Sequence, residues 1–342
     1  MYLTEKEILN EFSSIYRCLD YISGHEEEIR QTFQGRKKAW IVGSGSSYYL
    51  AKSAAAMLTL RCGIPSFAVT AGELLLHMEK YENAVKDSLV LFISRSGRTS
   101  EAVQSCRKIR ALSGVFTAAL CADPYGELCG LCGLTLCVPW AFDESVCQTR
   151  TIGSFYACLG MMTAILSDDK KLRNELYEVS GREAEWNEKI LPFAKEAAAW
   201  NWKRGIVLGD GEAAGVMEEA ALAFKEICGT NSNFYNVLDV RHGPMVVIDS
   251  EVLVFVFLEN GNDGVLSPLV KELAEKTDYL ITFGPGEPPY PGAVHKKVSG
   301  FDDPISYAIA ALYLLQNLTL QKALQKGLNP DQPAGLDAWI KL

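Results

Sequence analysis

The stretch Leu91–Glu101 (LFISRSGRTSE) runs from an apolar segment into a turn that is rich in hydroxyl groups. This pattern predicts a buried strand, a tight turn at Ser94–Thr99, and a helix that continues through Glu101, Ala102 and Val103. A helix N-terminus carries roughly half a positive charge, and free backbone N–H groups and Ser/Thr hydroxyls surround the same point. A phosphate monoester fits such a place without a lysine.

A second turn of the same kind lies upstream, after the apolar segment Ala39–Val42. Gly43–Tyr48 (GSGSSY) follows it, and a helical run continues over Leu50–Leu60. Glycine lets the backbone turn tightly, and Ser46 and Ser47 fall in the first helical turn, where their hydroxyls can face an anion. Either turn alone is typical of ordinary helix N-capping. Two such turns at the carboxyl edge of one parallel sheet predict a shared ligand site.

The composition is that of a globular protein of about two domains. The chain has 342 residues, of which 48% are hydrophobic and 22% are charged. Its net charge of −9 argues against a nucleic-acid partner, which needs clustered Lys and Arg. The N-terminus is charged from the start and shows no signal peptide, and no apolar run approaches the ~20 residues that cross a bilayer. We therefore expect a cytoplasmic protein without a membrane partner.

The ten cysteines are scattered, mostly in apolar contexts where a free thiol packs as a small hydrophobe. Cys129 and Cys132, with Cys137 beyond, form the one metal-like spacing, but no histidine or second Cys-x-x-Cys pair accompanies them. We expect core packing for these cysteines, and neither a metal nor an organic cofactor. A dinucleotide-binding fingerprint at Gly43 is disfavoured because Tyr48 stands at the place of its third glycine.

Strand-like segments alternate with helical segments in both halves, which predicts βαβ units and parallel sheets. The expected strands of the first half are Ala39–Val42, Ser66–Val69, Leu89–Ile93, Phe116–Cys121 and Leu134–Val138. Those of the second half are Gly205–Leu208, Asn233–Leu238, Val252–Leu258, Tyr279–Phe283 and Lys296–Val298. The sequence IVGSG at Ile41–Gly45 recurs as VLGDG at Val207–Gly211, which indicates an internal repeat.

The repeat and the composition predict a division of the chain. We expect a helical extension at 1–34, a first α/β domain with the anion site at 35–167, a helical linker at 168–202, a second domain at 203–328 and a tail at 329–342. The linker is rich in Glu, Lys, Ala and Leu and predicts one or two helices.

The two halves differ in the charge of their turns. Glu212 and Ala213 stand where the first half has two serines, and 259–263 (ENGND) stands where it has Ser94–Thr99. Carboxylates would repel a phosphate, so we expect an anion site in the first half alone. The alternative is that both sets of turns are plain surface loops, one polar and one acidic.

Two further residues suit proton transfer on an open-chain sugar. Glu226 ends the helical run Glu218–Glu226, and His242 lies in Val240–Met245 (VRHGPM), where Pro244 suits a first helical position. A carboxylate can carry a proton between C1 and C2 through an enediol, and a histidine can move the proton that opens a sugar ring. The spacing alone is equally consistent with two plainer roles. Glu226 would then be a solvated residue of an amphipathic helix, and His242 a loop histidine bonded to the backbone.

The chain resembles the SIS (sugar isomerase) family, with two tandem SIS domains, over nearly its whole length. It is similar to the isomerase half of glucosamine-6-phosphate synthase, to galactosamine-6-phosphate deaminase/isomerases and to fructoselysine-6-phosphate deglycases. The resemblance implies an α/β fold of two flavodoxin-like parallel sheets flanked by helices. The motifs that carry it are Gly43–Tyr48, Ser94–Thr99, Glu144–Arg150 (ESVCQTR), Phe224–Glu226 (FKE), Arg241–Pro244 (RHGP) and Asn329–Pro333 (NPDQP).

The same resemblance implies roles for individual residues and a homodimer or homotetramer. Glu226 matches the base for C1–C2 proton transfer, and His242 matches the ring-opening histidine, which in the synthase reaches in from the neighbouring subunit. Ser46 would touch the sugar, and Thr149 and Arg150 match a loop near the site. The residues expected around the phosphate are Ser47, Ser94, Arg95 (through its backbone), Ser96 and Thr99.

One departure from the synthase bears on the substrate. There a tail lysine forms a Schiff base with the ketose, whereas the aligned position here is Ala338 and Lys341 is out of register. A substrate that brings its own nitrogen needs no such lysine. We therefore expect a phosphosugar isomerase/deaminase that acts on a 6-phosphorylated amino sugar or ketosamine. A deglycase that releases an amino acid and a non-catalytic phosphosugar-binding protein are the alternatives.

Overall fold

A computed structural model describes residues 1–261, 263–286, 290–340 and 342 of the chain. The strands are β1 (Ala39–Gly43), β2 (Ser66–Thr70), β3 (Leu89–Ser94), β4 (Phe116–Cys121), β5 (Leu134–Cys137), β6 (Arg204–Leu208), β7 (Ser232–Tyr235), β8 (Val252–Phe257), β9 (Leu280–Gly284) and β10 (Val294–Lys297). The α-helices are α1 (Leu3–Leu9), α2 (Glu11–Gly24), α3 (Glu26–Phe33), α4 (Ser46–Cys62), α5 (Ala71–Leu76), α6 (Met78–Val85), α7 (Ser100–Ile109), α8 (Glu127–Leu131), α9 (Arg150–Leu166), α10 (Lys170–Gly181), α11 (Glu183–Ala199), α12 (Ala214–Glu226), α13 (Asp263–Ala274) and α14 (Pro304–Gln325). Short 3₁₀ turns are η1 (Pro139–Ala141), η2 (Gly211–Ala213), η3 (Asp239–Arg241) and η4 (Pro244–Val247).

The strands form two five-stranded sheets in which every neighbouring pair is parallel. Their orders are β2-β1-β3-β4-β5 and β10-β9-β8-β6-β7. Counted along the chain within each half, both orders read 2-1-3-4-5, the flavodoxin-like doubly wound order. The direction of winding reverses between β1 and β3 in the first sheet and between β6 and β8 in the second. The prediction of two flavodoxin-like parallel sheets is confirmed.

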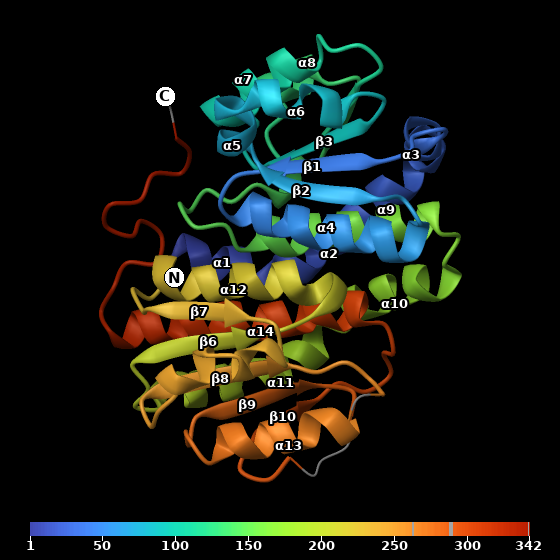
Figure 1. Cartoon of the computed structure of the whole chain (residues 1–342). Coiled ribbons are helices and arrows are strands. Elements are labelled where there is room, and N and C mark those ends of the chain that lie inside the picture. Colours follow the sequence, from blue (N-terminus) through green and yellow to red (C-terminus); the bar gives the residue numbers. More distant parts are fainter. Residues whose placement is uncertain (262, 287–289, 341) are drawn as a thin grey trace.

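Helices cover both faces of each sheet, so the central strands are apolar along their whole length. β3 (LVLFIS) and β8 (VLVFVF) are buried at every residue. Figure 1 shows α5–α8 on the outer face of the first sheet and α13 on the outer face of the second. Between the two sheets lies a layer of helices that includes α2, α4, α9, α12 and α14.

The middle of the molecule is one continuous hydrophobic core. A single cluster of touching buried side chains includes Leu91 of the first sheet and Phe255 of the second. The long helix α14 crosses this core, and most of its residues are buried. Its start is fixed by Pro304 at the first helical position and by the carboxylate of Asp303, which accepts a hydrogen bond from the Ile305 N–H at 3.0 Å.

The expected linker over 168–202 does contain two helices, α10 and α11, but they pack into the body of the molecule. The Trp186, Ile190 and Phe193 side chains of α11 are buried against the central core. The helices α1–α3 of the expected N-terminal extension also contribute buried side chains, such as Phe12. The domain limits themselves stay predictions.

Most expected strands match the structure to within one or two residues at each end. The exception is Asn233–Leu238, since β7 ends at Tyr235. Asn236 then donates its side-chain amide to Asp210 at 2.8 Å, and the chain enters the turn that leads to η3. Among the described residues, no helix combines the length and apolar character that a bilayer span requires.

Candidate active site

A cavity of about 240 Å³ lies at the carboxyl ends of β1 and β3, where the winding of the first sheet reverses. This is the place where open α/β sheets bind ligands. The turns after the two strands, which are 50 residues apart in the chain, do meet at one cavity as the sequence predicts. The lining residues are Ser44, Gly45, Ser46, Ser47, Ser94, Arg95, Ser96, Thr99, Val146, Gln148, Glu226, Leu336, Asp337, Ala338, Trp339 and Ile340.

The first turn brings the N-terminus of α4 to the cavity. A Cβ atom at Gly43 would lie 2.3 Å from the Ser47 backbone oxygen, so no side chain fits there. Gly45 has a φ of 56°, which favours glycine. No side chain caps α4, and Ser46 and Ser47 are both buried in its first turn. The positive end of the helix therefore faces the cavity.

The second turn holds its serines so that their protons are free for a ligand. The hydroxyl of Ser94 accepts a hydrogen bond from the Gly97 N–H at 3.0 Å, and that of Ser96 accepts one from the Arg98 N–H at 3.2 Å. A hydroxyl that accepts from backbone keeps its own O–H to donate. With Thr99 at the N-cap of α7, the turn offers donors to an anion.

Arg95 is buried and binds backbone carbonyls from two distant segments. Its guanidinium donates to the oxygens of Ser145 at 2.8 Å and Val146 at 3.1 Å, and to the Ala338 oxygen at 2.9 Å. Burial lowers the pKa of Arg95, and the nearby Asp143 carboxylate opposes that change. The side chain thus ties the 143–148 loop and the tail to the cavity, and its backbone remains in the second turn.

The 143–148 loop is also held from the N-terminal helix. The Glu7 carboxylate of α1 accepts hydrogen bonds from the backbone N–H groups of Glu144 at 2.6 Å and Ser145 at 3.1 Å, and from the Ser145 hydroxyl. Asp331 of the tail accepts from the Thr4 N–H at 2.8 Å. These contacts join α1, the loop and the tail on one side of the cavity.

Glu226, the last residue of α12, brings a carboxylate from the second half into this cavity. Burial raises its pKa, while the Cys147 thiol and the positive charges of Arg95 and Lys225 oppose the rise. A carboxylate of raised pKa is a stronger base than an exposed one. The structure therefore places a carboxylate of raised pKa beside the hydroxyl-rich turns.

A second carboxyl group, which the sequence analysis did not identify, lies behind Glu226. Glu219 is two helical turns earlier on the same face of α12 and is buried. Burial and the charge of Glu226 raise its pKa well above the usual range, and a hydrogen bond with Ser46 opposes the rise. The seven-residue spacing from Glu226 is the signal that could have indicated it.

Two expected site residues lie behind the cavity wall. Thr149 is buried, and its N–H donates to the Asp143 carboxylate at 2.9 Å while its carbonyl accepts from Gln316 of α14 at 3.0 Å. Arg150 donates to the Phe142 oxygen, and its Nε lies 3.7 Å from Asp143. Neither residue lines the cavity; Thr149 is the N-cap of α9 and Arg150 is its first residue, and their contact with substrate stays a prediction.

His242 also lies outside the cavity formed by its own chain. It is exposed at the end of η3, next to η4, whose first residue is Pro244. The neighbouring Leu238, Val246 and Val247 are unusually exposed for apolar residues, with 42%, 85% and 43% of their surface accessible. Glu226 and His242 are thus not brought together within one chain.

The matching edge of the second sheet is acidic, as its sequence indicates. A cavity of about 260 Å³ beside β6 and β8 is lined by Asp210 and Glu259 together with apolar side chains. Glu212, which stands at the place of the first-half serines, binds the guanidinium of Arg61 at 2.5 Å. Part of the 259–263 segment, Asn262, lies outside the described residues, as does Lys341 of the tail.

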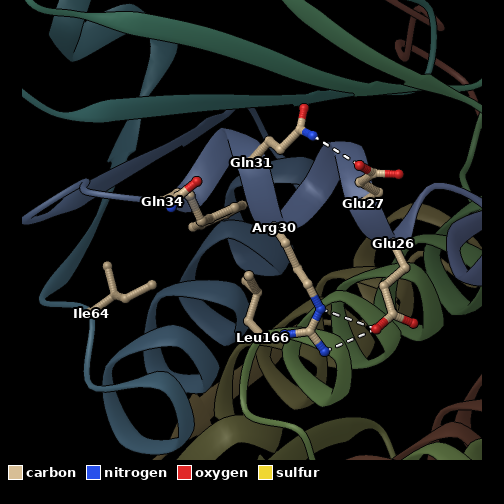
Figure 2. A pocket seen from close by; sticks show the side chains of 8 residues that line it. Glu26, Glu27, Arg30, Gln31, Gln34, Ile64 and Leu166 are labelled. Carbon is tan, nitrogen blue, oxygen red and sulfur yellow. Dashed lines mark hydrogen bonds and ion pairs between the residues drawn. The ribbon is translucent and has the colours of Figure 1, made fainter.

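A larger hollow of about 770 Å³ lies beside α3, but its charged groups already have partners. Figure 2 shows Arg30 directed at Glu26, which accepts from its Nη2 at 2.9 Å, and Gln31 directed at Glu27. Arg30 also pairs with Asp168 at 2.5 Å. Since these groups satisfy one another, this hollow is a weaker candidate than the cavity at β1 and β3.

The cysteines with metal-like spacing lie beside α7 and α8. The sulfur of Cys132 is 3.7 Å from that of Cys106, and the Cys129 thiol donates to the Asp123 oxygen at 3.3 Å. In the part of the chain that the structure describes, no three His, Cys, Asp or Glu side chains converge as ligands for a metal ion.

Comparison with known proteins shows which proteins this chain resembles. Residues 32–166 match the family model described as SIS domain. Glutamine–fructose-6-phosphate aminotransferase (isomerizing) of Pyrobaculum aerophilum is 26% identical over 326 residues, 91% of this chain and 52% of that protein. The Sulfolobus acidocaldarius protein of the same description is 25% identical over 352 residues, 97% of this chain and 54% of that protein. The chain spans about half the length of these relatives.

Solved structures share the fold over nearly the whole chain at lower identity. The C-terminal domain of glucosamine-fructose-6-phosphate aminotransferase from Francisella tularensis has a TM-score of 0.84 at 19% identity, and covers 97% of this chain and 98% of its own. Tagatose-6-phosphate ketose/aldose isomerase from Escherichia coli has a TM-score of 0.85 at 20% identity, covering 98% and 96%. Residues 32–166 of this chain therefore match the SIS domain model, and the chain has the fold of these two solved structures along nearly all its length.

Proposed function

We propose that this chain is a phosphosugar isomerase/deaminase, acting on a 6-phosphorylated amino sugar or ketosamine. One observation carries the proposal: a single cavity is lined both by the hydroxyl groups of two strand-to-helix turns and by the Glu226 carboxylate. The first feature suits a phosphate and the second suits a proton transfer. The second half of the chain then acts as a second SIS domain that supplies the base.

The phosphate binds at the turns after β1 and β3. Ser47, Ser94, Ser96 and Thr99 donate to its oxygens, and the N-termini of α4 and α7 add their positive partial charges. Ser46 is one residue nearer to the start of α4 and contacts the sugar. The carboxylates at the matching turns of the second half exclude a second phosphate there.

Glu226 carries a proton between C1 and C2 of the open-chain sugar. With a 2-amino aldose phosphate, it takes the C2 proton and returns it to C1, which leaves an imine at C2. Water then hydrolyses this imine to a ketose phosphate and ammonia. With a ketosamine phosphate, the proton moves from C1 to C2, and hydrolysis of the C1 imine releases an aldose phosphate and the amine. Both routes use one water molecule and no oxidant.

The tail supports a substrate that already contains nitrogen. Ala338 lines the cavity at the place where the synthase-type resemblance expects a lysine. An alanine methyl group forms no Schiff base, so the imine nitrogen comes from the substrate. Release of an amino acid, as in a deglycase, and release of ammonia remain the two forms of this reaction.

We propose further that His242 serves the cavity of a second copy in a homodimer or homotetramer. Three exposed apolar residues surround it, Leu238, Val246 and Val247, and such a patch favours a protein contact. A neighbouring chain that covers this patch would gain an imidazole for opening the sugar ring.

The role of Glu226 is tested by Glu226→Gln. Because glutamine cannot accept the carbon-bound proton, turnover of the active sugar phosphate should fall about a hundred- to ten-thousandfold, while binding of fructose 6-phosphate is kept. The assay is a panel of 6-phosphorylated amino sugars and ketosamines, read by the release of ammonia, amine and ketose. Retained turnover refutes the assignment.

The matched control is Glu218→Gln on the same helix, outside the cavity lining, where the carboxylate accepts from Lys52 at 2.6 Å. Its turnover should stay near that of the wild type. Saturable binding of hexose 6-phosphates with no turnover on any member of the panel would instead support the non-catalytic binding protein.

The contribution of a second copy is tested by mixing two inactive variants, Glu226→Gln and His242→Asn. In mixed dimers one of the two sites receives both wild-type groups, so an equal mixture should recover about a quarter of the wild-type activity. A mixture that stays as inactive as its parts contradicts a shared site, and a wild-type chain that sediments as a monomer contradicts the assembly.

A further inference from the structure

A cavity of about 230 Å³ in the second half shares no lining residue with the proposed active site. It lies between α11, the ends of β9 and β10, and α14. Phe283 is near the end of β9 and Lys296 is near the end of β10, and the two residues are paired in the register of the sheet.

Three aromatic side chains form the inner walls of this cavity. Trp186, Phe193 and Phe283 line it, and only 3–5% of the surface of each is exposed. The indole N–H of Trp186 donates to the Val179 oxygen at 2.9 Å. Since that polar atom is satisfied elsewhere, the aromatic walls offer apolar surface to a ring, which prefers offset or edge contacts with other rings.

Lysines lie at the opening of the same cavity. The Lys296 Nζ is 3.5 Å from the centre of the Phe193 ring, and burial lowers the pKa of Lys296. In the described part of the chain no carboxylate lies within 4.0 Å of Lys296; Glu196 acts on it from further away. A half-buried ammonium without a carboxylate at contact distance favours an anionic ligand.

We infer that this cavity binds a small aromatic carboxylate, with its ring among Trp186, Phe193 and Phe283 and its carboxylate at Lys296. The volume is below the roughly 300–1,000 Å³ of sites for drug-sized ligands, which favours a ligand of one ring. Lys189 lines the same cavity, but its charge is already paired with Glu185 at 2.6 Å, which leaves Lys296 as the cation for the carboxylate. The site is independent of the proposed catalytic function.

The inference is tested by calorimetric titration of the full chain with benzoate, benzamide and acetate. Benzamide keeps the ring without the charge, and acetate keeps the charge without the ring. Benzoate should bind saturably. Benzamide and acetate should each bind at least about tenfold more weakly, because benzamide lacks the negative charge and acetate lacks the ring. Equal binding of benzoate and benzamide, or no saturable binding of benzoate, overturns the inference.

The position of the ligand is tested by Lys296→Met, which keeps the length of the side chain and removes its charge. Benzoate affinity should fall about tenfold or more, while Lys195→Met, an exposed lysine of α11 outside the cavity lining, should leave it unchanged. Unchanged affinity in the Lys296 variant overturns the inference. If the methionine variant fails to fold, Lys296→Gln removes the same charge and keeps a polar side chain, and the same outcomes apply.

A competition experiment separates this cavity from the proposed active site. Saturating fructose 6-phosphate should leave the benzoate affinity unchanged, because the two cavities share no residue. Displacement of benzoate by the sugar phosphate would place the benzoate in the active-site cavity and overturn the inference. Neither result depends on whether the chain turns over a sugar.

Discussion

Glu219 and Glu226 are both carboxyl groups on one face of α12, and burial raises the pKa of each, that of Glu219 further. Glu226 is half-buried and lies near the positive charges of Arg95 and Lys225, which favour its charged form. Glu219 is buried, and the charge of Glu226 adds to the effect of burial, so its neutral form is favoured. The hydrogen bond with Ser46 opposes this effect, because it favours the charged form of Glu219.

At this scale the sequence predicted the serines, Thr99 and Glu226, because each belongs to a motif of fixed spacing. Glu219 stands beside Glu218 in the sequence, and its seven-residue spacing from Glu226 indicates only a shared helix face. Its contact with Ser46 depends on the approach of α4, which the sequence does not show. The position of Thr149 was not predictable for a similar reason, since its carbonyl accepts a hydrogen bond from Gln316 of the distant helix α14.

Glu11 of α2 is another buried carboxyl group, and neither of its oxygens has a hydrogen-bond partner within the described residues. Burial raises its pKa well above the usual value, and Asp143 and Glu219 add to the rise. Above the pKa of the unfolded chain, about 4.3, the folded state holds a proton that the unfolded state has lost. The free energy of unfolding therefore falls by about 1.4 kcal/mol per pH unit from this group until its folded pKa is reached.

We expect Glu11→Gln to remove this pH dependence, because the amide stays neutral at every pH. The variant should unfold with a smaller loss of stability between pH 5 and pH 8 than the wild type, as measured by urea unfolding at several pH values. The exposed Glu82→Gln should follow the wild-type curve. Parallel curves for wild type and the Glu11 variant contradict the assignment.

Among the elements, the strands and their parallel arrangement were predictable and the tertiary contacts of the loops were not. Continuous apolar segments such as Leu89–Ser94 carry their own signal. The 143–148 loop carries none, because it is held by Glu7 from 137 residues away and by Arg95 from 50 residues away. Sequence reasoning assigned Arg95 a backbone role at the phosphate, and the function of its side chain as a tie to the loop and the tail appears only in the structure.

The contacts of Glu7 predict that α1 contributes to substrate affinity. In Glu7→Gln, part of the hydrogen bonding from Glu144 and Ser145 is lost, which should lower the unfolding free energy by about 1–3 kcal/mol. The loosened loop should also weaken binding of fructose 6-phosphate, measured by titration. The control is Glu5→Gln on the same helix, which should change neither quantity. An unaltered affinity in the Glu7 variant would show that the loop keeps its position without this carboxylate.

For the whole molecule, the two sheets share one core, which the linear division into two domains and a linker did not predict. The side chains of α11 and α14 fill the space between the halves. A composition rich in Glu, Lys, Ala and Leu describes a linker helix and a packed helix equally well, so the sequence could place α10 and α11 but not their burial.

The shared core predicts that the two halves unfold together. Differential scanning calorimetry of the full chain should give one transition, with equal calorimetric and van't Hoff enthalpies. A fragment of residues 35–167 should expose the inner faces of α4 and α9 and fail to give a cooperative transition. Two separate transitions in the full chain, or a cooperatively folding fragment, would contradict this expectation.

The tie between Arg95 and Ala338 uses a main-chain oxygen, so it does not depend on which amino acid occupies position 338. The main-chain oxygen of residue 338 holds the tail, and its side chain faces the cavity. A substitution at position 338 would therefore change the side chain that lines the cavity while the hydrogen bond that holds the tail is kept.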